Sequence, residues 1–168
     1  GTSVALNKAG DVMVVGAQYN DAGGSNAGQV RVYSWNGTAW SQLGDSINGE
    51  GGDDRFGYSV SINGAGDRIV VGAFQNDAGS VVDNLNGTFS YTTPISKAGH
   101  ARIYSYNNGV WTQLGSDING DAVNDELGYS VDMNEAGDRV VVAIRQHDNT
   151  VGGNAGATRI FEYQTNDW

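Results

Sequence analysis

Short apolar segments separated by turn-forming residues run along the whole chain and predict strands. Residues 58–62 alternate between apolar and polar positions, residues 68–73 form a continuous β-branched run, and residues 101–106 alternate again. Alternation is typical of a half-buried strand, and a continuous run is typical of a strand covered on both faces. A fourth strand is predicted over residues 110–114, after the turn Asn107-Asn108-Gly109, whose residues readily adopt positive φ.

This pattern occurs three times. The strand-forming segment Gly57–Asn63 recurs as Gly128–Asn134 and, slightly altered, as Gly1–Asn7, and each copy leads through Ala-Gly-Asp into an apolar run. A second block, Gly-x-x-Arg followed by two apolar or aromatic residues, also occurs three times, and a Trp stands nine residues after each Arg. The second block and its tryptophans are Gly28–Tyr33 with Trp40, Gly99–Tyr104 with Trp111, and Gly156–Phe161 with Trp168.

The spacing of the copies defines three units and one insertion. Val4 and Val60 are 56 residues apart, whereas Val60 and Val131 are 71 apart, so the second copy carries 15 extra residues around positions 81–97. We therefore divide the chain into residues 1–56, 57–127 and 128–168, two complete units and a partial third. Both ends fall inside the pattern, and we expect the chain to be part of a longer polypeptide.

Four antiparallel strands per repeat of about fifty residues are typical of a β-propeller blade. The predicted fold is therefore all-β, with about three blades, each of which must stack on a neighbour to bury its sheet. Three blades do not close a ring. Either further blades complete it, or copies of the chain assemble, for example as two halves of a six-bladed ring; an open β-solenoid is the alternative architecture.

Composition and charge argue against several classes of binding partner and site. The formal charge is −10 and the chain is rich in Gly and Asp, which favour turns. A negative surface repels phosphate backbones, so we expect no nucleic-acid binding. No apolar run approaches the length of a membrane span, so we expect no membrane insertion. The chain has no cysteine, which excludes disulfides and thiolate metal sites.

The repeated motifs resemble those of the FG-GAP repeat family, found in integrin α-subunit heads and in large secreted microbial surface proteins. Phe56-Gly57-Tyr58-Ser59-Val60 is similar to the opening of that repeat, Val70–Phe74 to its second strand, and Gly99–Tyr104 to its third. Trp111–Gly120 resembles a segment of the microbial tandem repeats. The resemblance covers nearly the whole chain and implies an extracellular β-propeller module, secreted or at the cell surface.

The family often binds calcium in a loop with several aspartates between its first two strands. The corresponding turn here, Asn63–Asp67, has one carboxylate, fewer than calcium usually requires. We interpret Asp11, Asp67 and Asp138 as turn caps or as partners of Arg31, Arg102 and Arg159. The loops after the second strands hold more oxygen ligands, and they are the candidate calcium sites: Asn20, Asp21, Asn76, Asp77 and Asp148. Calcium is the one cofactor that the sequence suggests.

Other candidate sites lie in the insertion and the loops. Within residues 81–97, the apolar side chains of Phe89, Tyr91 and Ile95 form a candidate partner surface. Two sequons place candidate glycosylation sites at Asn36 and Asn86. His100 stands where the other copies have Gln29 and Ala157, and we expect it to be exposed.

The predicted function is adhesion or interaction, with a protein or glycan partner at the cell surface. No nucleophile motif or metalloprotease motif occurs, so we expect no enzyme. Two alternatives stay open. The chain could be a structural subunit that self-assembles into a filament or surface layer, or a propeller-type enzyme acting on polysaccharides.

Overall fold

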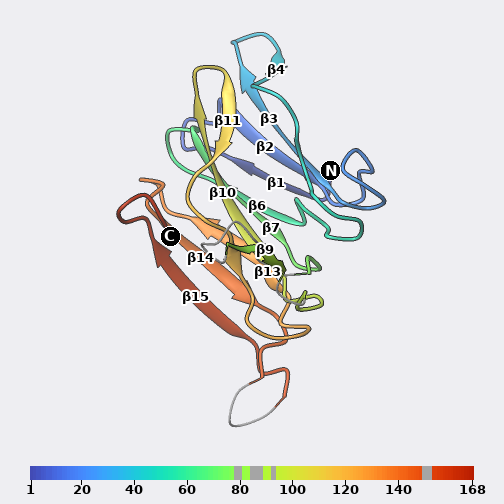
Figure 1. The fold of residues 1–168 in the computed structure, drawn as a ribbon. Coiled ribbons are helices and arrows are strands. Elements are labelled where there is room, and N and C mark those ends of the chain that lie inside the picture. Colours follow the sequence, from blue (N-terminus) through green and yellow to red (C-terminus); the bar gives the residue numbers. More distant parts are fainter. Residues whose placement is uncertain (78–80, 84–88, 92–93, 149–152) are drawn as a thin grey trace.

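The computed structural model describes residues 1–77, 81–83, 89–91, 94–148 and 153–168, with backbone only for 81–83 and 89–91. The described chain is all-β, and its main sheets lie side by side (Figure 1). The predicted fold class is thereby confirmed. Within these residues no helix is long and apolar enough to cross a membrane.

Blade 1 is a sheet in the order β1-β2-β3-β4. Its strands are β1 (Ser3–Leu6), β2 (Val12–Ala17), β3 (Gln29–Trp35) and β4 (Trp40–Gln42). A two-residue strand, β5 (Ile47–Asn48), pairs with the start of β3, where Gln29 lies opposite Asn48. The pattern of the sequence did not predict β5, because two residues are too few to show a period.

Blade 2 repeats this topology with β6 (Ser59–Ile62), β7 (Arg68–Ala73), β10 (His100–Asn107) and β11 (Val110–Gln113). The ends of these strands lie within one residue of the ends of the four predicted strands. A short β12 (Ile118–Asn119) pairs with β10, as β5 does with β3. Blade 3 contains β13 (Leu127–Met133), β14 (Arg139–Ile144) and β15 (Ala157–Glu162).

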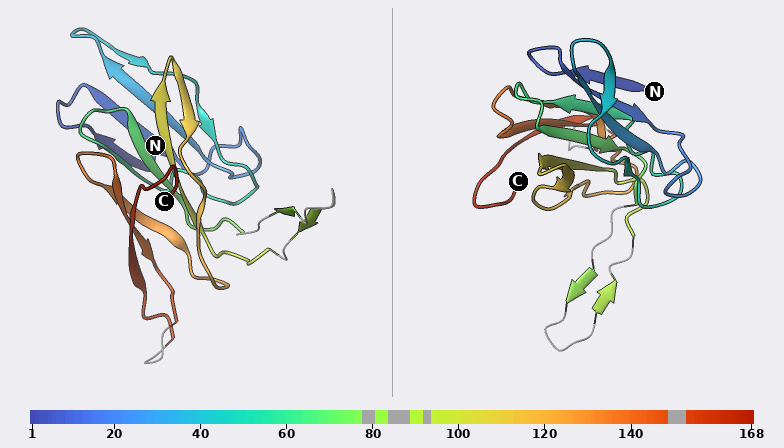
Figure 2. Two further views of the ribbon diagram at one scale, coloured as in Figure 1. Left: turned by 60° about the vertical axis from the view of Figure 1, so that its left-hand side comes forward. Right: turned by 90° about the horizontal axis from the view of Figure 1, so that it is seen from above.

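The insertion forms a hairpin of its own. β8 (Val81–Asp83) pairs antiparallel with β9 (Phe89–Tyr91) as a separate two-stranded sheet, which projects away from the blades (Figure 2). The side chains of Phe89 and Tyr91 lie outside the described part of the structure, as does Asn86 altogether. Ile95 is half-buried where the chain returns to blade 2.

Two apolar cores lie between the blades. Val14, Val30 and Val32 of blade 1 share one core with side chains of blade 2, including Val60 and Ile69. A second core joins blades 2 and 3 in the same way. The faces of β7 are buried on both sides, which explains its continuous β-branched sequence.

A close backbone contact fixes the distance between neighbouring blades. A Cβ atom added to Gly16 would lie 2.0 Å from the carbonyl oxygen of Gly57, and one added to Gly72 would lie 2.0 Å from that of Gly128. The hydroxyls of Ser3 and Ser59 donate to these same two carbonyl oxygens, at 2.9 and 2.8 Å. Glycine is therefore needed on β2 and β7 because the next blade approaches the backbone itself.

The recurring tryptophans also connect the blades. Nε1 of Trp111 donates to the carbonyl oxygen of Leu43 in blade 1 at 2.8 Å, and Nε1 of Trp168 donates to that of Leu114 in blade 2 at 2.7 Å. The leucine carbonyl of the Gln-Leu-Gly motif in one blade thus accepts a hydrogen bond from the Trp of the next blade. Buried indole nitrogens require such a partner, which accounts for the fixed spacing of both motifs.

Candidate functional site

A polar cavity of about 720 Å³ lies at the rim between blades 1 and 2. Its walls come from three segments that are far apart in sequence: the loop after β5, the loop after β7, and the end of the insertion. The lining residues are Glu50, Gly51, Gly52, Asp53, Asp54, Arg55, Gln75, Asn76, Asp77, Ser96 and Lys97. The blade junction and the insertion therefore build this cavity together.

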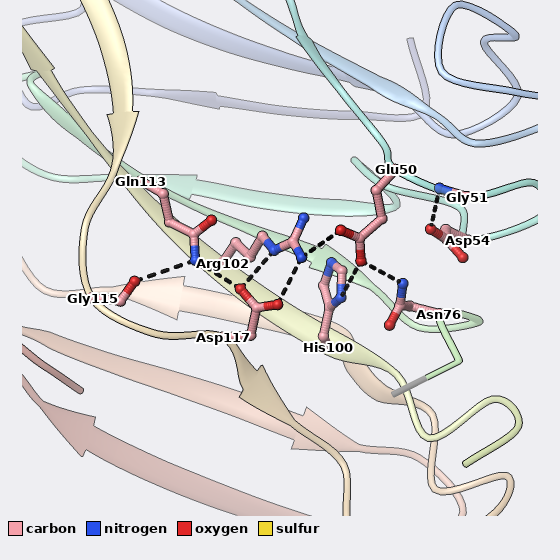
Figure 3. Close-up of polar contacts among 9 residues, drawn as sticks. All are labelled: Glu50, Gly51, Asp54, Asn76, His100, Arg102, Gln113, Gly115 and Asp117. Atoms are coloured by element: carbon pink, nitrogen blue, oxygen red, sulfur yellow. Dashed lines mark hydrogen bonds and ion pairs between the residues drawn. The ribbon is translucent and has the colours of Figure 1, made fainter. Parts of the chain in front are cut away.

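An ion-pair network adjoins the cavity (Figure 3). Arg102 on β10 donates to both carboxylate oxygens of Asp117 at 2.7 Å, and to Glu50 of blade 1 at 2.7 Å. Burial alone would lower the pKa of Arg102, but the hydrogen bonds that it donates to Asp117 and Glu50 outweigh burial and raise that pKa. The guanidinium therefore remains charged and ties blade 2 to blade 1.

His100 is a buried member of this network. Its side chain is only 2% exposed, and its Nδ1 lies 3.9 Å from Oε1 of Glu50. Its Nε2 is a buried nitrogen without a hydrogen-bond partner in the described structure. Burial, and next the charge of Arg102, lower the pKa of His100 to about 4, so this imidazole is neutral at pH 7.

The expectation that His100 is exposed was wrong. The residue begins β10, and there it pairs with Ala73 of β7 on one side and Asn119 of β12 on the other. The short strand β12 pairs with the start of β10, so His100 lies between two neighbouring strands. The polar and small residues at the equivalent positions, Gln29 and Ala157, gave no sign of this burial.

The network contains three potential metal ligands. Ligand atoms of Glu50, His100 and Asp117 all lie within 4.8 Å of one another. Both carboxylates, however, already accept hydrogen bonds from Arg102, whose guanidinium supplies the positive charge at this place. The donor set therefore does not fit a metal while Arg102 holds it, and the cluster serves as a structural link between blades.

The predicted metal ligands occupy equivalent loops in the three blades. Asp21 accepts the backbone N–H of Asn26 at 2.8 Å, Asp77 that of Lys97 at 2.9 Å, and Asp148 that of Asn154 at 2.7 Å. The three donors, Asn26, Lys97 and Asn154, have positive φ of 52°, 50° and 55°. Each aspartate thus secures one left-handed residue before the third strand.

The remaining candidates, Asn20 and Asn76, precede these aspartates. Asn20 accepts the N–H of Ala22 at 2.9 Å, and Asn76, which is buried, donates to Glu50 at 3.2 Å. Asn76 and Asp77 line the rim cavity. Among the described residues, no group of possible metal ligands contains Asp21, Asp77 or Asp148. Calcium binding at these residues stays a prediction.

The turn where the family often holds calcium is filled by an asparagine side chain. Oδ1 of Asn63 accepts the backbone N–H groups of Gly66, Asp67 and Arg68, and its Nδ2 donates to Asp67 at 2.8 Å. The equivalent pairs Asn7/Asp11 and Asn134/Asp138 repeat the side-chain bond. This turn does not fit calcium, because its one carboxylate is already engaged.

These aspartates also hold the third strand by their backbone. The carbonyl oxygens of Asp11, Asp67 and Asp138 accept the N–H groups of Trp35, Tyr106 and Tyr163. Among the ion pairs of the described residues, none joins them to Arg31, Arg102 or Arg159. Of the two interpretations of these residues, the structure supports turn capping.

Sequence reasoning missed the ion pairs between blades. Glu50 pairs with Arg102, and the equivalent Asp121 pairs with Arg159, each time across a blade junction. The signal was present, because an acidic residue follows Ile-Asn-Gly in both copies. The candidate glycosylation site Asn36 is exposed in the turn after β3, where its Oδ1 accepts the N–H of Thr38.

Comparison with known protein families gives a match to part of the chain. The family model of the FG-GAP repeat matches residues 48–87, which span the loop after β5, the strands β6 and β7, and part of the insertion. No curated protein matches the chain. The matched segment contains most of the cavity wall, and its strands recur in blades 1 and 3. Residues 48–87 are therefore similar to an FG-GAP repeat.

Proposed function

We propose that this chain is an extracellular adhesion or interaction module, which binds a protein or glycan partner through the rim cavity between blades 1 and 2. The observation that carries the proposal is the composition of the cavity wall. The two blades meet there, and Ser96 and Lys97, which precede the third strand of blade 2, complete the wall. Loops positioned by a rigid scaffold are where binding residues usually lie.

The chemistry of the wall favours a polar ligand. The wall contains four acidic residues and two cationic ones, and the rest of it is glycine, amide and hydroxyl. The acidic residues are Glu50, Asp53, Asp54 and Asp77, and the cationic ones are Arg55 and Lys97. Such a mixture of donors and acceptors suits the hydroxyl groups of a saccharide or the amides of a peptide. Arg55 also lies over the ring of Tyr19, 4.6 Å from its centre, which holds the guanidinium at the edge of the wall.

The carboxylates of the cavity favour binding over catalysis. Glycoside hydrolysis usually requires two carboxyl groups free to act on the substrate, one as acid and the other as base or nucleophile. Here Asp54 accepts the N–H of Gly51 at 2.8 Å, and Asp77 accepts that of Lys97 at 2.9 Å. Glu50 is paired with Arg102. These groups are used to hold loops and blades, so we assign the cavity to recognition.

A binding screen with matched variants tests this proposal. The chain would be screened against a panel of extracellular polysaccharides and matrix proteins, with product analysis for any polysaccharide that binds. We expect Lys97→Ala to weaken binding of any partner at least tenfold, because the substitution removes one cation from the wall. Lys8→Ala is the control: it removes an exposed lysine from the turn between β1 and β2. Partners that bind both variants equally, or cleavage of a polysaccharide, would contradict the proposal.

A further inference from the structure

Two tyrosines from neighbouring blades lie against each other. Tyr58 immediately precedes β6 of blade 2, and Tyr129 lies on β13 of blade 3. Their ring centres are 5.0 Å apart, with an angle of 44° between the ring planes. Among the aromatic pairs of the described residues, this pair alone is formed by two tyrosines. It brings together residues that are 71 positions apart in the sequence.

Neighbouring side chains hold the two rings in place. Phe74 follows β7, and its ring centre lies 4.4 Å from that of Tyr58 and 5.5 Å from that of Tyr129. The guanidinium of Arg145 lies over Tyr129, 4.9 Å from its ring centre. Both tyrosines are nevertheless partly exposed, so a small molecule can reach them from solvent. The rings are therefore held in one arrangement and remain accessible.

The hydroxyl ends of the two tyrosines lie together. The pKa of Tyr58 is raised to about 12, first by the hydrogen bond with the Tyr129 side chain and next by burial. The ring carbons next to the two hydroxyl-bearing carbons, the ortho carbons, are therefore also close to each other. Phenols that lose one electron and one proton couple through their ortho carbons, and the coupled product carries its two hydroxyls side by side. The arrangement of the pair thus resembles that of the coupled product.

The repeat itself does not require this pair. Thr2 occupies the position of Tyr58 in blade 1, so the junction of blades 1 and 2 has a threonine in place of one tyrosine. Gln18 and Arg145 stand where blade 2 has Phe74. The chain also has no cysteine, so no disulfide can join its blades. The tyrosine pair is thus specific to the junction of blades 2 and 3, and the packing common to the repeats does not explain it.

We propose that Tyr58 and Tyr129 form an oxidative cross-linking site, at which a small one-electron oxidant joins blades 2 and 3 through dityrosine. Each phenol loses one electron and one proton, and a carbon–carbon bond forms between the two ortho carbons. The hydrogen on each of these carbons then moves to the phenolic oxygen, which restores both aromatic rings. Two equivalents of the oxidant, such as an organic radical generated by a peroxidase, take up the two electrons, and the two protons pass to water.

Peptide mapping after oxidation tests the proposal on the whole chain. The dilute protein is oxidised briefly with photogenerated ruthenium(III) tris(bipyridine), digested, and analysed by mass spectrometry for linked peptides. We expect an intramolecular link between the peptides of Tyr58 and Tyr129, together with dityrosine fluorescence. Tyr58→Phe and Tyr129→Phe keep the aromatic packing, and we expect each of them to lose both signals. In urea, we expect the linked chain to unfold at a higher midpoint, because the bond restrains the unfolded chain between two distant positions.

Tyr19→Phe is the matched control. Tyr19 is 64% exposed, so the oxidant reaches it readily, but it has no tyrosine beside it among the aromatic pairs of the described residues. We expect the link to form in this variant as in the unmodified chain. Proximity of the two rings, and not exposure, then decides which tyrosines couple.

Three outcomes would overturn the proposal. The first is the absence of a linked peptide in samples where Tyr19 has been oxidised, since the oxidant was then active and the pair did not couple. The second is a linked product that survives Tyr58→Phe or that Tyr19→Phe removes. The third is a link between Tyr58 and Tyr129 that forms only between two chains, which a mixture of isotopically labelled and unlabelled protein would show.

Discussion

At the scale of single residues, His100 is a buried histidine at a position where the equivalent residue of blade 1 is a glutamine. Blade 1 has Gln29 at this position, and its amide donates to Asn48 at 2.7 Å. His100 has Asn119 as its backbone neighbour but leaves Nε2 without a partner. The residue is tolerated because its low pKa keeps it uncharged near neutral pH.

The pKa of His100 predicts a loss of stability in mild acid. The folded pKa of about 4 lies below the ordinary value of 6.5, so the unfolded chain binds the proton more tightly. The contribution is constant above pH 6.5, and stability falls as the pH drops from there to about 4. A shift of this size corresponds to about 3 kcal/mol. The groups facing His100 are Arg102, Asp117 and Glu50.

Urea unfolding at a series of pH values checks this prediction. We expect the free energy of unfolding of the unmodified chain to decrease between pH 6.5 and 4, and His100→Gln to remove most of that decrease. Glutamine is the matched replacement because blade 1 already holds it at the equivalent position. Parallel curves for the two proteins over this range would show that another group causes the decrease.

At the scale of elements, the strands could be predicted from the sequence, but the role of the polar residues in the loops after them could not. Alternation located β6, β10 and β11, and a continuous β-branched run located β7, which is buried on both faces. The carboxylates of Asp21, Asp77 and Asp148 were predicted as metal ligands, and in the structure they accept backbone N–H groups. Both roles need the same oxygen atoms after the same strand, so residue type alone does not separate them.

The contact of β7 with blade 3 gives a prediction at this scale. Gly72→Ala places a methyl group 2.0 Å from the carbonyl oxygen of Gly128, which must force the blades apart. We expect the substitution to lower the free energy of unfolding by roughly 3 kcal/mol, the upper part of the usual range for overpacking. The measurement is the urea unfolding midpoint.

Gly52→Ala is the matched control for this substitution. A Cβ at Gly52 would meet only the carbonyl oxygen of Ser25, at 3.4 Å, which is an ordinary contact. We expect its unfolding midpoint to stay close to that of the unmodified chain. Equal effects of the two substitutions would mean that the close approach of the blades is not what requires glycine on β7.

At the scale of the whole molecule, the repeats predicted that the blades stack, while the contacts between them came only from the structure. The internal similarity of the three copies was sufficient to expect blades, since one four-stranded sheet cannot bury both of its faces. The pairing of Glu50 with Arg102 joins residues 52 positions apart, and the recurring acidic residue after Ile-Asn-Gly does not by itself show which arginine it meets. The cavity likewise joins three distant segments, and its wall could not be assembled from the sequence.

An engineered disulfide between blades 2 and 3 tests the stacked arrangement most directly. The hydroxyl of Ser61 on β6 donates to Oδ1 of Asp132 on β13 at 2.8 Å, so these two side chains meet across the junction of blades 2 and 3, and cysteines are placed at both positions. The chain has no cysteine of its own, which leaves no competing thiol. We predict that Ser61→Cys combined with Asp132→Cys forms an intramolecular disulfide on mild oxidation, seen by mass spectrometry of the linked peptides, while each single variant forms none. A double variant that folds and keeps both thiols free within the monomer would contradict the stacking of the blades.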